Sequence, residues 1–214
     1  IMAVADRCTV LRRGKCIGTV NTDETTVEEL SRMMVGRDVS LSVEKGESAV
    51  GDTVLSVRGL TAAGSRKKEA VKNVSFDVHG GEILCIAGIE GNGQSELIYA
   101  LTGLEKILSG QVSLCGKDIT KATVRSRSKG GMSHIPEDRH KYGLILDFML
   151  EQNLVLQRYW ERAFQSRGFI KNGAVRQYAE GLIEQYDIRS GQGPVTVARS
   201  MSGGNQQKAI VARE

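Results

Sequence analysis

Hydrophobic and polar positions change their spacing along the chain, and the first fifty residues form one small group of expected elements. Apolar residues at 8–11 and 16–20 flank a polar turn that contains a glycine, which predicts a β-hairpin. Acidic residues follow Thr25 and Thr26, so one of these threonines is expected to cap a short helix. The segment 36–52 is polar and aperiodic, which is typical of a linker.

A denser apolar pattern follows this linker and predicts a larger body. The short runs with the composition of strands are 54–57, 70–78, 83–87, 112–115 and 132–136. The run 83–87 is continuously apolar, so it is expected to be a buried strand.

Helical spacing is expected at 95–101, after the loop that follows the run 83–87, and again at 150–158 and 174–186. The last segment carries an apolar stripe that core packing explains: Val175, Tyr178, Ala179, Leu182, Ile183 and Tyr186. Strand, loop, helix and strand in this order indicate an α/β domain around a partly parallel sheet.

Composition narrows the class of protein. The chain has 214 residues, 40% of them hydrophobic and 25% charged, enough for one domain and a piece of a second. A net charge of +4, spread along the chain, and 5% aromatic residues argue against a nucleic-acid surface. The sequence has no apolar run long enough to span a membrane and no signal-peptide pattern at its start. The four cysteines have no paired spacing typical of metal sites.

The chemistry begins directly after the run 83–87, in the stretch GIEGNGQS at 88–95. Its spacing is that of a phosphate-binding loop, with Gln94 where the pattern has lysine. Glycines let the backbone point its N–H groups at an anion, and a helix that opens at Ser95 adds a favourable dipole. A plain glycine turn between strand and helix is the competing interpretation. The candidate residues are Gly88, Glu90, Gly91, Asn92, Gly93, Gln94, Ser95 and Glu96.

A second motif, MSGGNQQK at 201–208, is close to the LSGGQ signature of ATP-binding cassette ATPases. It offers a hydroxyl and bare backbone N–H groups at the start of another expected helix, which is again a place for an anion. An isolated Ser-Gly-Gly is only a loop before a helix, but here both motifs occur in the order and at the separation of a cassette. The candidate residues are Ser202, Gly203, Gly204, Asn205 and Gln206.

From about residue 53 to its end, the chain resembles the second nucleotide-binding domain of a tandem ATP-binding subunit from a bacterial sugar or nucleoside importer. The loop GIEGNGQSEL, the stretch IPEDRHKYGL at 135–144 and the signature followed by NQQK carry the resemblance. It implies a P-loop NTPase fold, with a mixed sheet, helices and a helical subdomain that carries the signature. Residues 1–50 would be the tail of a preceding cassette and a linker. Residues 51–214 would be a second cassette, truncated before its Walker B strand.

The resemblance also implies ATP and Mg²⁺ as ligands, with Ser95 as a Mg²⁺ ligand. Glu137 stands at the Q-loop position, where this family usually has a glutamine that contacts metal and water; a surface carboxylate is the alternative. Gln94 carries no charge, so losing the ionic part of a contact worth roughly 1.5–3 kcal/mol weakens triphosphate binding about ten- to a hundredfold. Glu90 and Glu96 would repel phosphate unless they point away.

Cassettes of this superfamily dimerise head to tail, so each ATP lies between one phosphate loop and the partner cassette's signature. The signature of this chain would complete the other cassette's site, and its altered loop would head an impaired one. We expect an ATPase within the full subunit and no complete ATPase site within this chain.

Transmembrane permease subunits are the expected partners, and the cassette would reach the membrane only through them, at the cytoplasmic face of the bacterial inner membrane. The apolar segment 148–169 either docks to the permease or forms a satellite core. Two other functions stay open: a soluble cassette ATPase acting on nucleic acid or ribosomes, and a scaffold half that needs no nucleotide.

Overall fold

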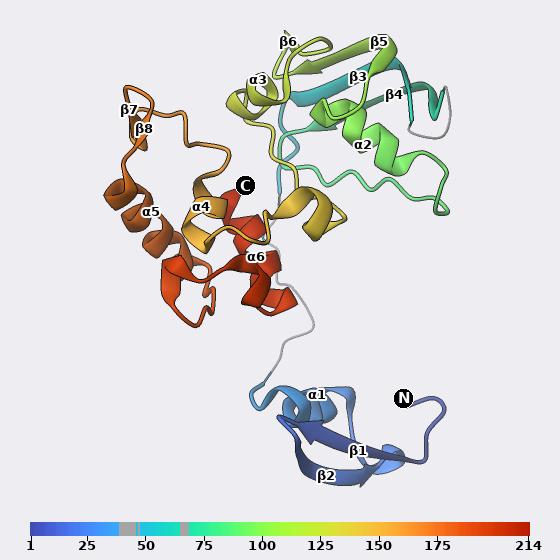
Figure 1. Cartoon of the computed structure of the whole chain (residues 1–214). Helices are drawn as coiled ribbons and strands as arrows, with labels where there is room; N and C mark the ends of the chain where they lie inside the picture. Colours follow the sequence, from blue (N-terminus) through green and yellow to red (C-terminus); the bar gives the residue numbers. More distant parts are fainter. Residues whose placement is uncertain (39–45, 47, 65–68) are drawn as a thin grey trace. The chain divides into compact units, whose positions relative to one another are not determined.

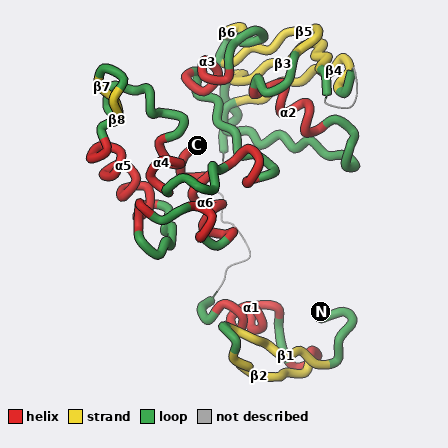
Figure 2. The backbone as a smooth tube through the Cα atoms, viewed as in Figure 1, coloured by secondary structure: helices red, strands yellow, loops and turns green. Residues whose placement is uncertain are grey.

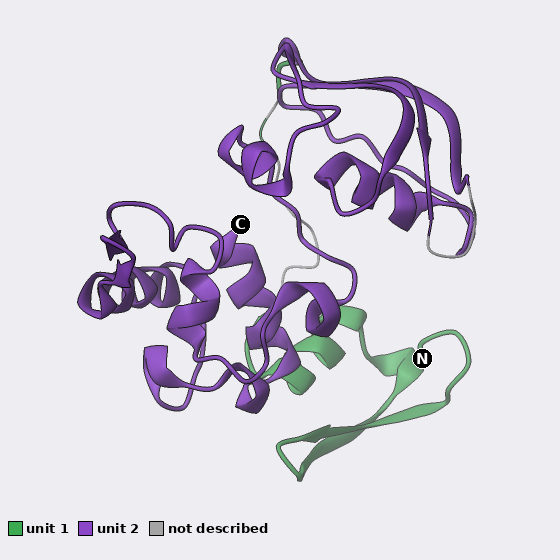
Figure 3. Cartoon of the chain, turned by 45° about the horizontal axis from the view of Figure 1, so that its top comes forward, with its two compact units in different colours: residues 1–49 green, residues 50–214 purple. Residues whose placement is uncertain are grey.

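The computed structural model describes residues 1–38, 46, 48–64 and 69–214, and the chain divides into two compact units, 1–49 and 50–214 (Figure 3). Of the linker expected at 36–52, residues 39–45 and 47 lie outside the described residues. No helix in the part of the chain that the structure describes is long and apolar enough to cross a membrane.

The first unit contains the expected hairpin and helix. Strands β1 (Arg7–Arg12) and β2 (Lys15–Asn21) pair antiparallel, and their two-residue turn has φ angles of 50° and 76° at Arg13 and Gly14. A turn with two positive φ angles matches the twist of a hairpin, and glycine takes one of them without strain. A 3-10 turn (Thr22–Glu24) leads on to the helix.

Helix α1 (Val27–Val35) begins at Thr26, whose hydroxyl accepts a hydrogen bond from the backbone N–H of Glu29 at 3.2 Å. Of the two threonines expected as caps, Thr26 is therefore the one that caps the helix. The helix ends at Gly36, which has a φ of 87°.

The second unit begins with a four-stranded sheet in the order β4-β3-β5-β6 (Figure 1). Its strands are β3 (Thr53–Ala62), β4 (Val71–His79), β5 (Ile107–Leu114) and β6 (Lys117–Asp118). The strands expected near 54–57, 70–78 and 112–115 are confirmed. All described pairings in this sheet are antiparallel, so the parallel pairing that we expected is not among them.

Two other expected strands are not present. The run 83–87 is drawn as loop between β4 and α2 (Figure 2), and Ile83 is 78% exposed. The run 132–136 is likewise irregular. A strand needs a neighbour for its backbone N–H and C=O groups, and no described strand lies beside either run. A continuous apolar run is therefore not sufficient evidence for a strand, and the prediction of a buried strand at 83–87 is wrong.

Helix α2 (Gln94–Thr102) follows the glycine-rich loop and packs on the sheet. Its Leu97 and Leu101 join Val57, Leu60 and Val112 in one core cluster. Burial of each leucine side chain contributes about 1.5–3 kcal/mol, so this face fixes the loop's helix to the sheet.

Helix α3 (Val124–Lys129) holds the far end of α2 through Arg127, whose side chain is 3% exposed. Its guanidinium donates to the carbonyls of Ala100 and Leu101 in the last turn of α2, and to those of Thr120 and Ala122. The bond to Leu101 satisfies a carbonyl at the end of α2, where a helix leaves its last carbonyls without intrahelical partners, and the bond to Ala100 adds to the one from the Gly103 N–H.

The rest of the second unit is mainly helical. It contains α4 (Leu150–Val155), α5 (Asn172–Gln185), α6 (Gly203–Arg213), the short strands β7 (Gln165–Ser166) and β8 (Phe169–Ile170), a π-helical turn (Arg139–Gly143), and 3-10 turns at Gly193–Val195 and Ala198–Ser200. The three α-helices share a core that includes Leu150, Leu154, Ala179 and Ala209. The apolar stripe on α5 faces this core and its neighbouring cluster, as expected, whereas α4 ends before the predicted residue 158.

Candidate nucleotide site

The glycine-rich loop makes a tight turn into α2. Gly91 and Gly93 have φ angles of 85° and 107°, which other residues rarely adopt, and Gly93 is the N-cap of the helix. A methyl group at Gly93 would also stand 2.7 Å from the carbonyl oxygen of Ala70. Both conformation and space therefore require glycine at position 93.

Gln94 folds back over this loop. Its side-chain amide nitrogen donates to the carbonyl oxygen of Ile89 at 3.3 Å. A methyl group at Gly88 would stand 2.0 Å from the same nitrogen, so the amide lies across the first glycine. The neutral amide thus occupies space within the loop.

Ser95 and Glu137 come together although they are far apart in the sequence. The hydroxyl of Ser95, in the first turn of α2, donates to the Glu137 carboxylate at 3.0 Å. A cavity of about 250 Å³ opens beside them, lined by Gln94, Ser95, Ile98, Tyr99, His134, Ile135 and Glu137. Glu90 and Glu96 do not line it: Glu90 is exposed, and Glu96 lies against Gly64.

These two oxygens fit a magnesium ion. Mg²⁺ takes oxygen ligands at 2.0–2.1 Å in octahedral geometry, so two neighbouring ligands stand about 2.9 Å apart, close to the Ser95–Glu137 separation of 3.0 Å. No group of three or more His, Cys, Asp or Glu that could hold a metal occurs in the described ranges. Mg²⁺ usually keeps several waters and binds one or two protein groups plus phosphate oxygens, so a pair of ligands suffices.

Tyr99 and His134 are the two ring side chains that line this cavity, and Tyr142 lies behind Tyr99 without lining it. Tyr99 lies with its ring centroid 5.3 Å from that of Tyr142 and 6.2 Å from that of His134. Burial raises the pKa of Tyr99 and lowers the pKa of His134, and both shifts favour the neutral form. Glu137 is therefore the charged side chain among those that line the cavity.

The second motif lies at the start of α6. Ser202 is the N-cap residue, and its hydroxyl accepts a hydrogen bond from the Asn205 side chain at 2.9 Å. Asn205 also accepts from the backbone N–H of Arg189, at 2.9 Å. No atom lies within 4 Å of the position that a Cβ would take at Gly204, so this backbone is accessible.

Gln206 differs from the other residues of this motif, because its side chain is buried. It donates to the carbonyl of Ala198 at 3.0 Å and lies 3.0 Å from the Nε2 atom of His140. It therefore links α6 to the π-helical turn and is not presented with Ser202 and Gly204. None of the signature residues lines the cavity at Ser95.

Arg139 is a residue that the sequence analysis missed as a site residue. A methyl group at Gly203 would stand 3.0 Å from its Nη2 and 3.3 Å from its Cζ, so the guanidinium lies across this glycine. The available signal was its place two residues after Glu137, in the stretch that carried the resemblance. A cation and a helix N-terminus together favour an anion at the start of α6.

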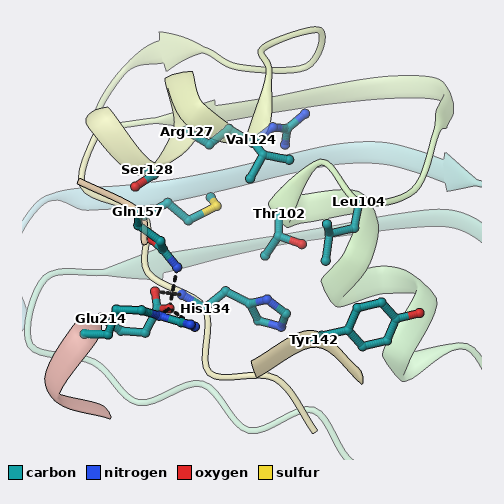
Figure 4. A pocket seen from close by; sticks show the side chains of 11 residues that line it. Thr102, Leu104, Val124, Arg127, Ser128, His134, Tyr142, Gln157 and Glu214 are labelled. Carbon is teal, nitrogen blue, oxygen red and sulfur yellow. Dashed lines mark hydrogen bonds and ion pairs between the residues drawn. The ribbon is translucent and has the colours of Figure 1, made fainter. Parts of the chain in front are cut away.

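A further cavity, of about 170 Å³, holds none of the candidate residues (Figure 4). His134 and Tyr142 line it together with Thr102 and Leu104 from the end of α2, and with Arg127. Near it the backbone N–H of His134 and the side chain of Gln157 donate to the Glu214 carboxylate. This cavity lies among α2, α3 and α6; no residue of either motif lines it, and it shares His134 with the cavity at Ser95.

A glycine-rich loop that opens a helix packed on a sheet, with a helical part that carries a second glycine-rich helix start, defines a P-loop nucleotide-binding protein. The family comparison narrows this class: residues 71–214 match the family described as ABC transporter. The chain belongs to this family.

Several relatives resemble the chain over its whole length. It is 46% identical to the guanosine import ATP-binding protein NupO of Bacillus subtilis, over 99% of the chain and 41% of that protein. It is also 46% identical to the nucleoside import ATP-binding protein NupA of Lactococcus lactis, over 100% of the chain and 42% of that protein. The ribose import ATP-binding protein RbsA of B. subtilis is 33% identical, over 100% of the chain and 42% of that protein. The chain thus spans about two-fifths of the length of these relatives.

Solved structures confirm the fold that we expected. A dimeric ATP-binding cassette in a post-hydrolysis state, bound to ADP and phosphate, matches with a TM-score of 0.56 and 22% identity, over 74% of this chain and 68% of that chain. A nucleotide-free cassette matches with a TM-score of 0.58 and 19% identity, over 75% and 64%. The second unit therefore has the fold of an ATP-binding cassette.

Proposed function

We propose that this chain is part of an ATP-binding subunit that couples ATP binding and hydrolysis to the import of a nucleoside or simple sugar across the bacterial inner membrane. The names and the identity of the relatives support this class of cargo. The observation that carries the proposal is the pair of glycine-rich starts of α2 and α6, each of which presents backbone N–H groups at a helix N-terminus.

In this proposal, the loop at 88–95 heads a site of weakened turnover. The lysine that would neutralise phosphate charge is replaced by Gln94, and its amide is bonded to Ile89. Negative charge grows on the phosphates in the transition state, so a missing cation affects hydrolysis more than binding. Mg²⁺, held by Ser95 and Glu137, supplies positive charge to the phosphate oxygens when it is bound.

The signature would contact a different nucleotide, the one bound to the phosphate loop of a second cassette in a head-to-tail dimer. Ser202 and Gly204 are exposed, Gly203 has Arg139 beside it, and together they form a surface suited to phosphate. Domain identity follows the same proposal: residues 1–50 belong to a preceding cassette with its linker, and residues 51–214 to a second cassette.

Permease subunits are the proposed partners, at the cytoplasmic face of the membrane. The sequence left two interpretations of the apolar segment 148–169, an exposed docking patch and a buried core, and the segment contains side chains of both kinds. Leu154 and Phe164 are buried in the helical cores, whereas Tyr159 is 43% and Phe169 79% exposed. We assign the exposed members to permease contact and the buried ones to packing.

ATPase measurements on the full-length protein in its assembled transporter test this division of roles. Ser202→Ala and Gly204→Val should each abolish most activity, because they alter the signature that completes the active site. Gln94→Ala should change activity little. Ser200→Ala is a matched control, since this exposed serine lies just before the motif and its hydroxyl donates to the carbonyl of Val197, one turn back in the same segment. The opposite ranking of the Gln94 and Ser202 variants would contradict the proposal.

A further inference from the structure

The charge of the cavity at Ser95 does not suit a free triphosphate. Its lining contains the Glu137 carboxylate but neither lysine nor arginine. Gln94 is neutral where a phosphate-binding loop has a cation. Backbone N–H groups and the N-terminus of α2 supply only partial positive charge. A polyphosphate that entered alone would meet a carboxylate at the point where the loop should neutralise it.

The same carboxylate is well placed for a cation. Its oxygen already stands 3.0 Å from the Ser95 hydroxyl, at the spacing of neighbouring magnesium ligands. The segment that carries it is held in place: Pro136 before it is buried, and the Asp138 carboxylate after it accepts from the backbone N–H groups of His140 and Lys141 at 2.9 and 3.0 Å. The two ligands therefore do not depend on a nucleotide to be brought together.

We propose that Ser95 and Glu137 form a divalent-cation site that fills before nucleotide, and that this loop takes ATP or ADP only with the cation in place. The inference rests on the proposed function, because it takes the loop as a phosphate site. Glu137 then replaces the missing lysine indirectly, since it holds a doubly charged ion where the pattern has a fixed ammonium. Linkage makes the effect reciprocal: the cation raises nucleotide affinity by the factor by which nucleotide raises cation affinity.

Mn²⁺ alone, in the full-length protein without nucleotide, tests the first part. Electron paramagnetic resonance measures the Mn²⁺ that remains free in solution. The difference in bound Mn²⁺ between the wild type and a variant reports on this site, even if the protein binds manganese elsewhere. Glu137→Gln should weaken this binding at least about tenfold, and Ser95→Ala should weaken it less, because the carboxylate provides most of the attraction. Glu180→Gln removes the same charge from an exposed position on α5 and should change nothing. Equal Mn²⁺ binding by the wild type and Glu137→Gln overturns the inference.

Nucleotide binding tests the second part, by calorimetry with ADP in excess Mg²⁺ or in EDTA. We expect binding to the wild-type loop to fall about a hundredfold in EDTA. Gln94→Lys should reduce this dependence to about tenfold, because a fixed cation then does part of the work. A dependence on Mg²⁺ that is the same in both proteins overturns the inference. If nucleotide does not bind to this loop even with Mg²⁺, the proposed function fails, whereas the Mn²⁺ result at Glu137 stands or falls by itself.

Discussion

The guanidinium of Arg139 lies across the α-carbon of Gly203, so a cation stands at the N-terminus of the signature helix. A positive side chain at this end of a helix opposes the helix dipole and costs about 0.3–1 kcal/mol unless an anion compensates it. Within the described residues Arg139 forms no ion pair. The arrangement is unfavourable for folding alone and favourable for binding phosphate.

The first prediction concerns the space between these two residues. Gly203→Ala should lower the free energy of unfolding by about 1 kcal/mol, because its methyl group would press on the guanidinium of Arg139. Adding Arg139→Ala should remove most of this cost, so the pair is strongly coupled. Gly204→Ala is the matched control, with open space around its methyl group, and it should be neutral or slightly stabilising. Urea unfolding of the wild type, Gly203→Ala, Arg139→Ala and the double variant gives the coupling energy; additive effects would show that the contact is absent.

The second prediction concerns the charge of Arg139. Arg139→Ala should lower the ATPase activity of the assembled transporter about ten- to a hundredfold, the value of a charged hydrogen bond to phosphate. Arg139→Lys should recover part of this loss, because lysine keeps the charge but not the planar fork. The control is Arg199→Ala, which removes an exposed arginine paired with Asp147. Activity retained by Arg139→Ala would mean that this side chain only packs.

The third prediction concerns Arg127. Arg127→Met keeps the volume but removes the guanidinium bonds to the buried carbonyls of Leu101 and Ala100, of which Ala100 keeps the Gly103 N–H, so the free energy of unfolding should fall by about 3 kcal/mol. Arg125→Met is the matched control on the same helix: its bond to the Tyr159 hydroxyl is exposed, and its loss should cost below about 1 kcal/mol. Chemical denaturation measures both. Equal losses would show that Arg127 does not hold the end of α2.

The fourth prediction concerns pH. Burial lowers the pKa of His134 in the folded chain, so the unfolded chain binds the proton more readily. Its contribution to stability is complete above the unfolded pKa of about 6.5 and is lost as pH falls from there towards the lower folded value. His134→Gln should therefore flatten the fall in unfolding free energy between about pH 7.5 and 5.5. Hydrogen bonds lower the pKa values of Asp138 and Asp187, so these two residues change the unfolding free energy only in more acidic solution. An unchanged slope in the variant would assign the pH effect to another group.

Features encoded within a few neighbouring residues could be predicted from the sequence. The turn at Arg13 and Gly14, the cap at Thr26 and the start of α2 each depend on local backbone chemistry. The loop conformation of 83–87 could not be predicted: its apolar run wrongly indicated a buried strand, because a strand is completed by neighbours that its own sequence does not describe.

The candidate site shows the same division. The resemblance put Glu137 at the Q-loop position, and in the structure its carboxylate accepts from the Ser95 hydroxyl. The inward turn of Gln206 and the position of Arg139 over Gly203 depend on how α6 packs against the π-helical turn. A motif names residue types, but packing decides which side chains it presents.

Glu137 and Arg139 have one residue between them, and they face different partners: the first contacts the helix of the phosphate loop, and the second contacts the signature helix. Asp138 fastens the turn that follows, and Gln206 ties that turn to α6. In the proposed head-to-tail pair these two contacts would serve different ATP molecules. The backbone from Glu137 to Arg139 would then couple the two sites mechanically. Nucleotide bound at one site would change the position of this segment and so the nucleotide affinity of the other.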